Sequence, residues 1–112
     1  MKQRDITTEE LEKLVDNDDS DFILWLSKEY CHHCKDYEKE IADLDLEGGI
    51  LRIKLLFTQN RLLREIKQIL GFDLRGFPVT MHIKGGDVIK EFYGNKIEKL
   101  RELIIEMNLT SM

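Results

Sequence analysis

The feature that most constrains the fold is a run of five consecutive apolar residues at positions 22–26. Its length suits a β-strand, and the lack of alternating polar residues indicates a strand that is covered on both faces. Such a strand requires a layered architecture in which helices pack above and below a sheet. We therefore expect residues 22–26 to lie in the middle of a sheet.

The segments on either side of this run carry helical patterns. Thr7 and Glu10 have the spacing of a capping box, which predicts a helix over residues 8–16. Apolar residues at helical spacing predict further helices over residues 31–47 and 60–70 and from position 95 onward. Asn60 and Asn95 are the expected N-caps of the last two.

Strand patterns fill the intervals between these helices. Residues 50–58 predict a second strand, and residues 79–83 and 88–93 predict an antiparallel hairpin that turns at Gly85 and Gly86. Strands joined through helices must pair in parallel. The predicted fold class is therefore α/β, a mixed four-stranded sheet with two parallel-type βα units, a C-terminal hairpin and helix, and helices on both faces. Residues 1–112 are expected to form one domain.

Composition excludes several classes of function. The net charge of -5 disfavours a protein that follows a phosphate backbone, so we expect no nucleic-acid partner. No apolar run is long enough to span a bilayer, and no signal peptide is recognisable. The two cysteines lie too close in sequence to tie distant parts together. We therefore expect a cytoplasmic, monomeric protein without a membrane partner.

The cysteines, Cys31 and Cys34, flank His32 and His33 directly after the apolar strand. Two thiols at this spacing can close a disulfide with each other. Cys31 is expected at the first turn of a helix, where free N–H groups and the helix dipole favour a thiolate. This predicts Cys31 as a nucleophile and Cys34, one turn further in, as a buried resolving thiol. His32 and His33 are candidates for tuning that thiolate, although one of them, His32, could simply be exposed to solvent.

Metal binding is the competing interpretation of these four side chains. Four neighbours at one helix start cannot all turn toward a single tetrahedral zinc, and no second Cys/His pair supplies the missing ligands. His82 stands alone on a predicted strand. We expect no metal and no cofactor, and an iron–sulfur cluster shared between two chains is the alternative.

Taken together, these motifs resemble the thioredoxins over nearly the whole chain. The resemblance is carried by residues 30–35, Lys54 on the next strand, Gly-Phe-Pro at 76–78 and the glycine turn of the hairpin. It implies the thioredoxin fold, thiol–disulfide exchange and a cis Phe77-Pro78 peptide bond. It also implies that Tyr30, Phe77 and Pro78 contact substrate. Lys54 is a candidate for proton transfer or else a solvated strand residue.

The chain also departs from the thioredoxin pattern. Thioredoxins carry Trp-Cys-Gly-Pro-Cys, whereas Tyr30 precedes the first thiol here and two histidines separate the thiols. The place of their buried strand aspartate falls on Trp25, which we expect to fill the core. A histidine beside Cys31 stabilises the reduced thiolate, so we expect the pair to be more oxidising than thioredoxin.

The sequence thus predicts a thiol–disulfide oxidoreductase that exchanges electrons between protein disulfide or dithiol substrates and an unidentified recycling reductase. The alternative is a redox-inactive, thioredoxin-like binding module. Such a module would hold a partner through the loop around Pro78 and the neighbouring apolar surface.

Overall fold

The computed structural model describes residues 1–110, with side chains as far as Asn108. The order of elements is β1 (Lys2–Asp5), α1 (Thr8–Val15), β2 (Asp21–Lys28), α2 (His32–Ala42), β3 (Gly49–Leu55), α3 (Asn60–Leu70), β4 (Val79–Lys84), β5 (Asp87–Tyr93) and α4 (Ile97–Thr110).

The strands form one mixed sheet in the order β1-β3-β2-β4-β5. Strand β2 is central, as its uninterrupted apolar run predicted. It pairs in parallel with β3, where Leu26 faces Ile53, and antiparallel with β4, where Leu26 faces Val79. The hairpin of β4 and β5 is antiparallel, also as predicted. The expected α/β class is therefore confirmed.

The predicted number of strands, four, is wrong because the sheet has five. The additional strand is β1, which pairs in parallel with β3 from Lys2 opposite Gly49 to Asp5 opposite Arg52. Its residues are mostly polar and exposed, so they carry no apolar alternation that would mark a strand. An edge strand of this kind is held by backbone hydrogen bonds to its neighbour, which sequence patterning does not reveal.

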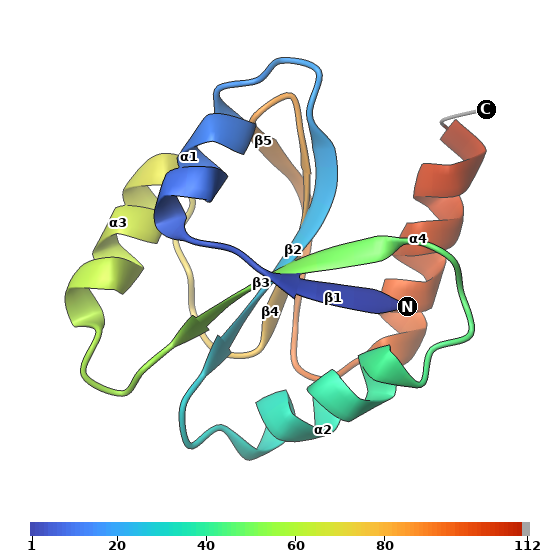
Figure 1. Cartoon of the computed structure of the whole chain (residues 1–112), viewed down its shortest axis with the longest axis horizontal. Coiled ribbons are helices and arrows are strands. Elements are labelled where there is room, and N and C mark those ends of the chain that lie inside the picture. Colours follow the sequence, from blue (N-terminus) through green and yellow to red (C-terminus); the bar gives the residue numbers. More distant parts are fainter. Residues whose placement is uncertain (111–112) are drawn as a thin grey trace.

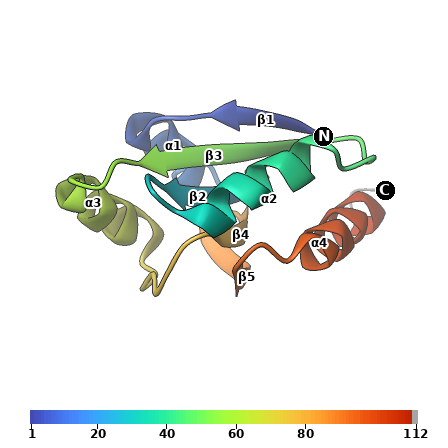
Figure 2. The same cartoon turned by 90° about the horizontal axis from the view of Figure 1, so that it is seen from below.

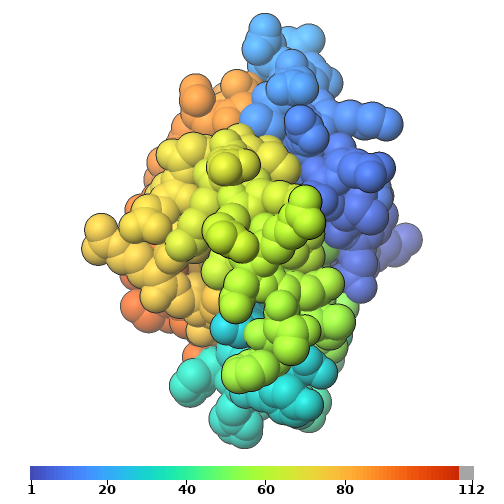
Figure 3. Space-filling view, turned by 90° about the vertical axis from the view of Figure 1, so that its left-hand side faces the viewer, coloured from blue at the N-terminus to red at the C-terminus, as the bar shows by residue number. Residues whose placement is uncertain are grey.

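Two helices cover each face of the sheet, with α1 and α3 on one side and α2 and α4 on the other (Figures 1 and 2). Leu24 of β2 points into the first layer with Leu11 of α1 and Ile66 of α3. Trp25 points into the second layer with Tyr37 of α2. In the space-filling view of the first side, α3 spans the middle of the surface beside α1 (Figure 3). No helix within residues 1–110 combines the length and apolarity needed to cross a membrane.

The start of α1 follows the predicted capping box. The backbone N–H of Glu10 donates to Thr7 Oγ1 at 3.1 Å, and the backbone N–H of Thr7 donates to the Glu10 carboxylate at 3.4 Å. Reciprocal bonds of this kind satisfy two donors that a helix start otherwise leaves free. The local sequence therefore decides where α1 begins.

Other predicted boundaries are wrong. Helix α2 ends at Ala42 rather than near residue 47, because the chain turns there and buries Leu44 against the core. The N-cap of α3 is Gln59 rather than Asn60, without a side-chain cap hydrogen bond. Strand β3 ends at Leu55 rather than 58, and α4 begins at Ile97. The shift at the start of α3 is a single residue, which is within the usual variation of helix ends.

Candidate active site

The candidate site lies where three elements meet at one edge of the sheet. The end of β2 pairs with the end of β3 at Lys28 and Leu55 and with the start of β4 at Leu26 and Val79. The residues that follow β2 and those that precede β4 therefore lie at the same edge. This topology brings the cysteine pair and the loop containing Pro78 to one end of the molecule.

Cys31 and Cys34 are joined by a disulfide, with their Cα atoms 5.2 Å apart. Cys31 is the N-cap of α2, and its Sγ accepts a hydrogen bond from the backbone N–H of Cys34 at 3.2 Å. Cys31 is half-buried, whereas Cys34 is 4% exposed. Cys31 is thus partly accessible from solvent, whereas Cys34 is enclosed.

The two histidines between them are both exposed on the first turn of α2. His32 Nε2 lies 3.4 Å from the Asp36 carboxylate, one turn further along the helix. His82 lies elsewhere, buried on β4 against Asp21 at the start of β2. Among the residues that the structure describes, no three His, Cys, Asp or Glu side chains are grouped to hold a metal ion.

An aromatic surface adjoins the cysteines. The Tyr30 ring is 80% exposed and packs edge-on against Phe57 with ring centroids 6.2 Å apart. Lys28 Nζ lies 5.7 Å from the Phe57 ring centroid and 5.6 Å from that of Phe77. The Phe77-Pro78 peptide bond is cis, and Pro78 is buried. Sequence reasoning missed Phe57 and Lys28, since it placed Phe57 within a strand.

A cavity of about 260 Å³ lies beside the buried thiol. Cys34 and the predicted Lys54 both line it, so the structure brings these two residues together. Glu38, Arg52 and Ser27 share its wall. Sequence reasoning missed these three, although Glu38 stands four residues after Cys34 and hence on the same helix face.

Comparison with known proteins identifies the architecture. No protein-family model matches the sequence, and no curated protein matches it either. Thioredoxin f from spinach chloroplast, in its short form, superposes with a TM-score of 0.70 at 20% identity, over 94% of this chain and 92% of its own. This chain has the thioredoxin fold. The resemblance inferred from the sequence motifs is thus confirmed at the level of the fold.

Two further solved structures agree. Thioredoxin from Aeropyrum pernix superposes with a TM-score of 0.58 at 24% identity, over 88% of this chain and 84% of its own. A thioredoxin f2, solved in complex with ferredoxin:thioredoxin reductase, superposes with a TM-score of 0.68 at 18% identity, over 96% of both chains.

Trp25, at which the sequence resemblance places the strand aspartate of thioredoxins, lies in the core of this fold. Its side chain is fully buried, packs edge-on against Tyr37 with centroids 5.0 Å apart and has the guanidinium of Arg52 5.7 Å from its ring centroid. The Arg52 guanidinium in turn forms ion pairs with the carboxylates of both Asp5 and Glu38. The hydrogen bond with Asp5 raises the pKa of Arg52, and the same bond lowers the pKa of Asp5.

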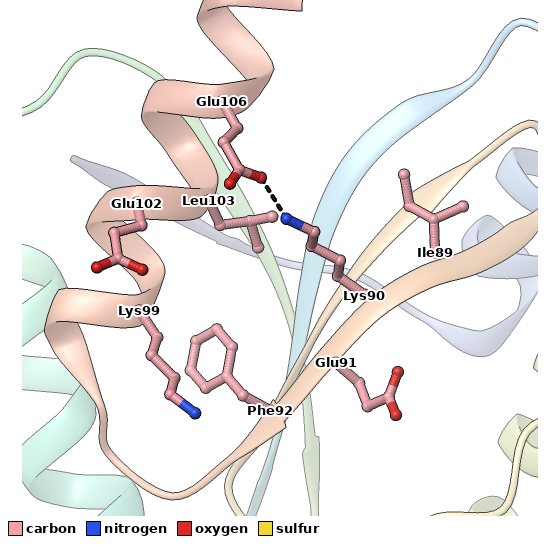
Figure 4. A pocket seen from close by; sticks show the side chains of 8 residues that line it. All are labelled: Ile89, Lys90, Glu91, Phe92, Lys99, Glu102, Leu103 and Glu106. Carbon is pink, nitrogen blue, oxygen red and sulfur yellow. Dashed lines mark hydrogen bonds and ion pairs between the residues drawn. The ribbon is translucent and has the colours of Figure 1, made fainter.

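A second hollow, of about 390 Å³, lies away from the cysteines, between β5 and α4 (Figure 4). Phe92 and Leu103 meet there beneath an ion pair between Lys90 and Glu106. None of the predicted site residues lines it. The cysteine pair lies elsewhere, at the start of α2.

Proposed function

We propose that this protein is a thiol–disulfide oxidoreductase that exchanges electrons with protein disulfides and dithiols. One observation carries the proposal. Cys31 and Cys34 pair at the N-terminus of α2, with the Cys31 sulfur partly accessible and hydrogen-bonded by a helix N–H group. N–H donors and the positive end of a helix dipole stabilise a thiolate, which is the form that attacks disulfides.

The reaction proceeds by two exchange steps. The Cys31 thiolate attacks one sulfur of a substrate disulfide, forming a mixed disulfide and releasing the other substrate sulfur as a thiolate. Cys34 then attacks Cys31 Sγ, which closes the Cys31–Cys34 disulfide and releases the second substrate thiolate. Two electrons pass to the substrate, and the reverse sequence oxidises a substrate dithiol.

The aromatic surface around the cysteines is the proposed contact for substrate. Tyr30 and Phe77 present rings beside Cys31, and Phe57 with Lys28 extends the same surface. The loop that ends at Pro78 lies at the same end of the sheet as Cys31, and we propose that its backbone aligns an extended segment of the substrate. An exposed ring as large as that of Tyr30 is typical of binding surfaces.

The two exposed histidines support a potential above that of thioredoxin. An imidazole near Cys31 that is positively charged, or that donates a hydrogen bond, stabilises the reduced thiolate more than the disulfide. The disulfide is then a stronger oxidant. His33, directly before Cys34, and His32, directly after Cys31, both occupy the turn that carries the thiolate. Of the two, His32 already has a carboxylate partner in Asp36, so we assign the larger effect to His33.

The proposal extends to partners and setting. The thioredoxin f2 noted above was solved with a ferredoxin:thioredoxin reductase, which supports a recycling reductase for this chain as well. We further propose that residues 1–112 act as one monomeric domain without a bound cofactor, in the cytoplasm, where close cysteine pairs stay redox-active.

The test is reduction of insulin by dithiothreitol in the presence of the protein. Accelerated precipitation of the insulin B chain, lost in both Cys31→Ser and Cys34→Ser variants, is expected. No acceleration by the wild-type protein would favour the alternative, a redox-inactive binding module. Thermal unfolding of both variants under reducing conditions verifies that they remain folded.

A further inference from the structure

The buried thiol of Cys34 needs a proton acceptor, and Trp25 cannot provide one at the strand position where thioredoxins carry an aspartate. Cys34 must lose its proton when its sulfur attacks the mixed disulfide, because the thiolate is the nucleophile. In thioredoxins the strand aspartate serves this step, but Trp25 stands there in this chain and its indole has no basic atom. The cavity beside Cys34 is lined by other side chains that can accept a proton.

Glu38 is the carboxylate best placed on that cavity wall. It follows Cys34 by one helical turn of α2, so both side chains leave the same face of the helix. Both line the cavity of about 260 Å³. Arg52 Nη1 lies 3.0 Å from Glu38 Oε1, and the other guanidinium edge is held by Asp5. The ion pair holds the Glu38 carboxylate at the rim of the cavity, where its side chain is 49% exposed and can pass a proton on to solvent.

An independent observation points to a polar path through the same cavity. Ser27 is 3% exposed, lines the cavity with Cys34 and Glu38, and its hydroxyl has no hydrogen-bond partner among the residues that the structure describes. A buried hydroxyl requires a partner, and a polar cavity of this size has room for water. Water bonded to Ser27 can connect a thiol and a carboxylate that do not touch.

We propose that Glu38 accepts the proton of the Cys34 thiol through this cavity during the second exchange step. The inference rests on the proposed function. As the Cys34 sulfur forms its bond to Cys31 Sγ, the bond from Cys31 to the substrate sulfur breaks and the substrate leaves as a thiolate. The Cys34 proton passes by way of water to the Glu38 carboxylate and then to solvent, so charge and atoms balance.

Other charged groups face the same cavity and define the competing explanations. Lys28, Lys35 and Lys54 contribute ammonium groups, and Glu29 contributes a second carboxylate at the rim. Lys54 is the main rival, since a neutral amine could also accept a proton. A purely electrostatic role for Glu38 is the other rival. In that case its negative charge would raise the pKa of the neighbouring thiol, and removing it would speed the attack by Cys34.

A stopped-flow reaction of the reduced protein with an excess of the aromatic disulfide DTNB separates the two steps. Attack by Cys31 releases a first coloured thiolate at a rate proportional to reagent concentration. Attack by Cys34 on the mixed disulfide at Cys31 releases a second coloured thiolate, at a rate that does not depend on the reagent concentration. The variants are Glu38→Gln and Glu38→Asp, and Glu40→Gln is the matched control on the same helix, outside the cavity.

We expect Glu38→Gln to leave the first phase within about twofold of wild type and to slow the second by about tenfold or more at neutral pH. In Glu38→Gln the second phase should reach the wild-type rate only at a higher pH. Glu38→Asp should recover part of the rate at neutral pH. Glu40→Gln should show the wild-type rate of both phases. A second phase that is unchanged or faster in Glu38→Gln would overturn the inference. A second phase that is slowed in Lys54→Gln but not in Glu38→Gln would overturn it as well. Absence of the first phase in wild type would instead refute the proposed function.

Discussion

The backbone N–H of Cys34 donates a hydrogen bond to the Sγ atom of Cys31 at 3.2 Å. The sulfur therefore occupies the place that a serine or aspartate side chain takes at an ordinary helix N-cap. Because this interaction favours negative charge on Cys31, it distinguishes the two cysteines electrostatically as well as by exposure. Their roles in the exchange reaction should differ accordingly.

Replacing Cys34 by serine should trap the mixed disulfide on Cys31. The variant keeps the half-exposed nucleophile but loses the buried thiol that would release the substrate. Mass spectrometry of the variant after incubation with a peptide disulfide should show one peptide attached per chain. Cys31→Ser should show almost no adduct in the same period, and equal labelling of both variants would contradict the assigned roles.

Replacing His33 by glycine should make the cysteine pair more reducing. The proposed tuning role implies that the imidazole stabilises the thiolate more than the disulfide, so its loss should favour the disulfide. Equilibration with glutathione buffers should give a potential lower by about 30 mV or more, equivalent to a tenfold change in the equilibrium constant. His82→Gln serves as the control because His82 lies on β4, away from the cysteines. Equal potentials for wild type and His33→Gly would refute the tuning role.

Replacing Tyr37 by phenylalanine should destabilise the fold. The Tyr37 hydroxyl bonds Thr80 Oγ1 at 2.7 Å between α2 and β4, in a fully buried setting where burial raises the pKa of Tyr37. The variant leaves Thr80 without this partner, which should cost about 1–3 kcal/mol in urea unfolding. Adding Thr80→Val should recover part of that loss. Tyr30→Phe, on an exposed ring, should change stability by less than about 0.5 kcal/mol.

Replacing Asp5 by asparagine should make the free energy of unfolding less dependent on pH in the acidic range. The hydrogen bond from Arg52 lowers the pKa of Asp5 from its ordinary value of 3.8, so the folded state binds its proton less readily than the unfolded state. The stabilisation is present above about pH 4 and is lost as the pH falls through the folded-state value. Because the Asp5 side chain is 64% exposed, solvent screening keeps the effect small.

Urea unfolding at pH 7 and pH 3 provides the measurement. The free energy of unfolding should fall less between these two pH values in Asp5→Asn than in wild type. Asp45→Asn, at an exposed position outside the sheet, should retain the wild-type difference. A fall in Asp5→Asn as large as that of wild type would show that the Arg52 contact does not contribute.

Local sequence signals predicted much of the fold because they arise from short-range physics. The capping box at Thr7 satisfies donors within one helical turn, and the stop at Gly71 uses a left-handed backbone that glycine adopts readily. The fully apolar stretch at residues 22–26 favoured a strand covered on both faces, and β2 is such a strand. The same reasoning placed Cys31 at a helix start, which the structure bears out as the N-cap.

By itself, then, the sequence determined the α/β class, the central strand and the position of the cysteine pair at the beginning of a helix. Only the tertiary structure decided that residues 2–5 form an edge strand and that Glu38, Arg52 and Ser27 share a cavity with Cys34. These three residues come from α2, β3 and β2, and no local pattern links them. Their meeting depends on strand register and on how α2 packs over the sheet, which the whole chain fixes together.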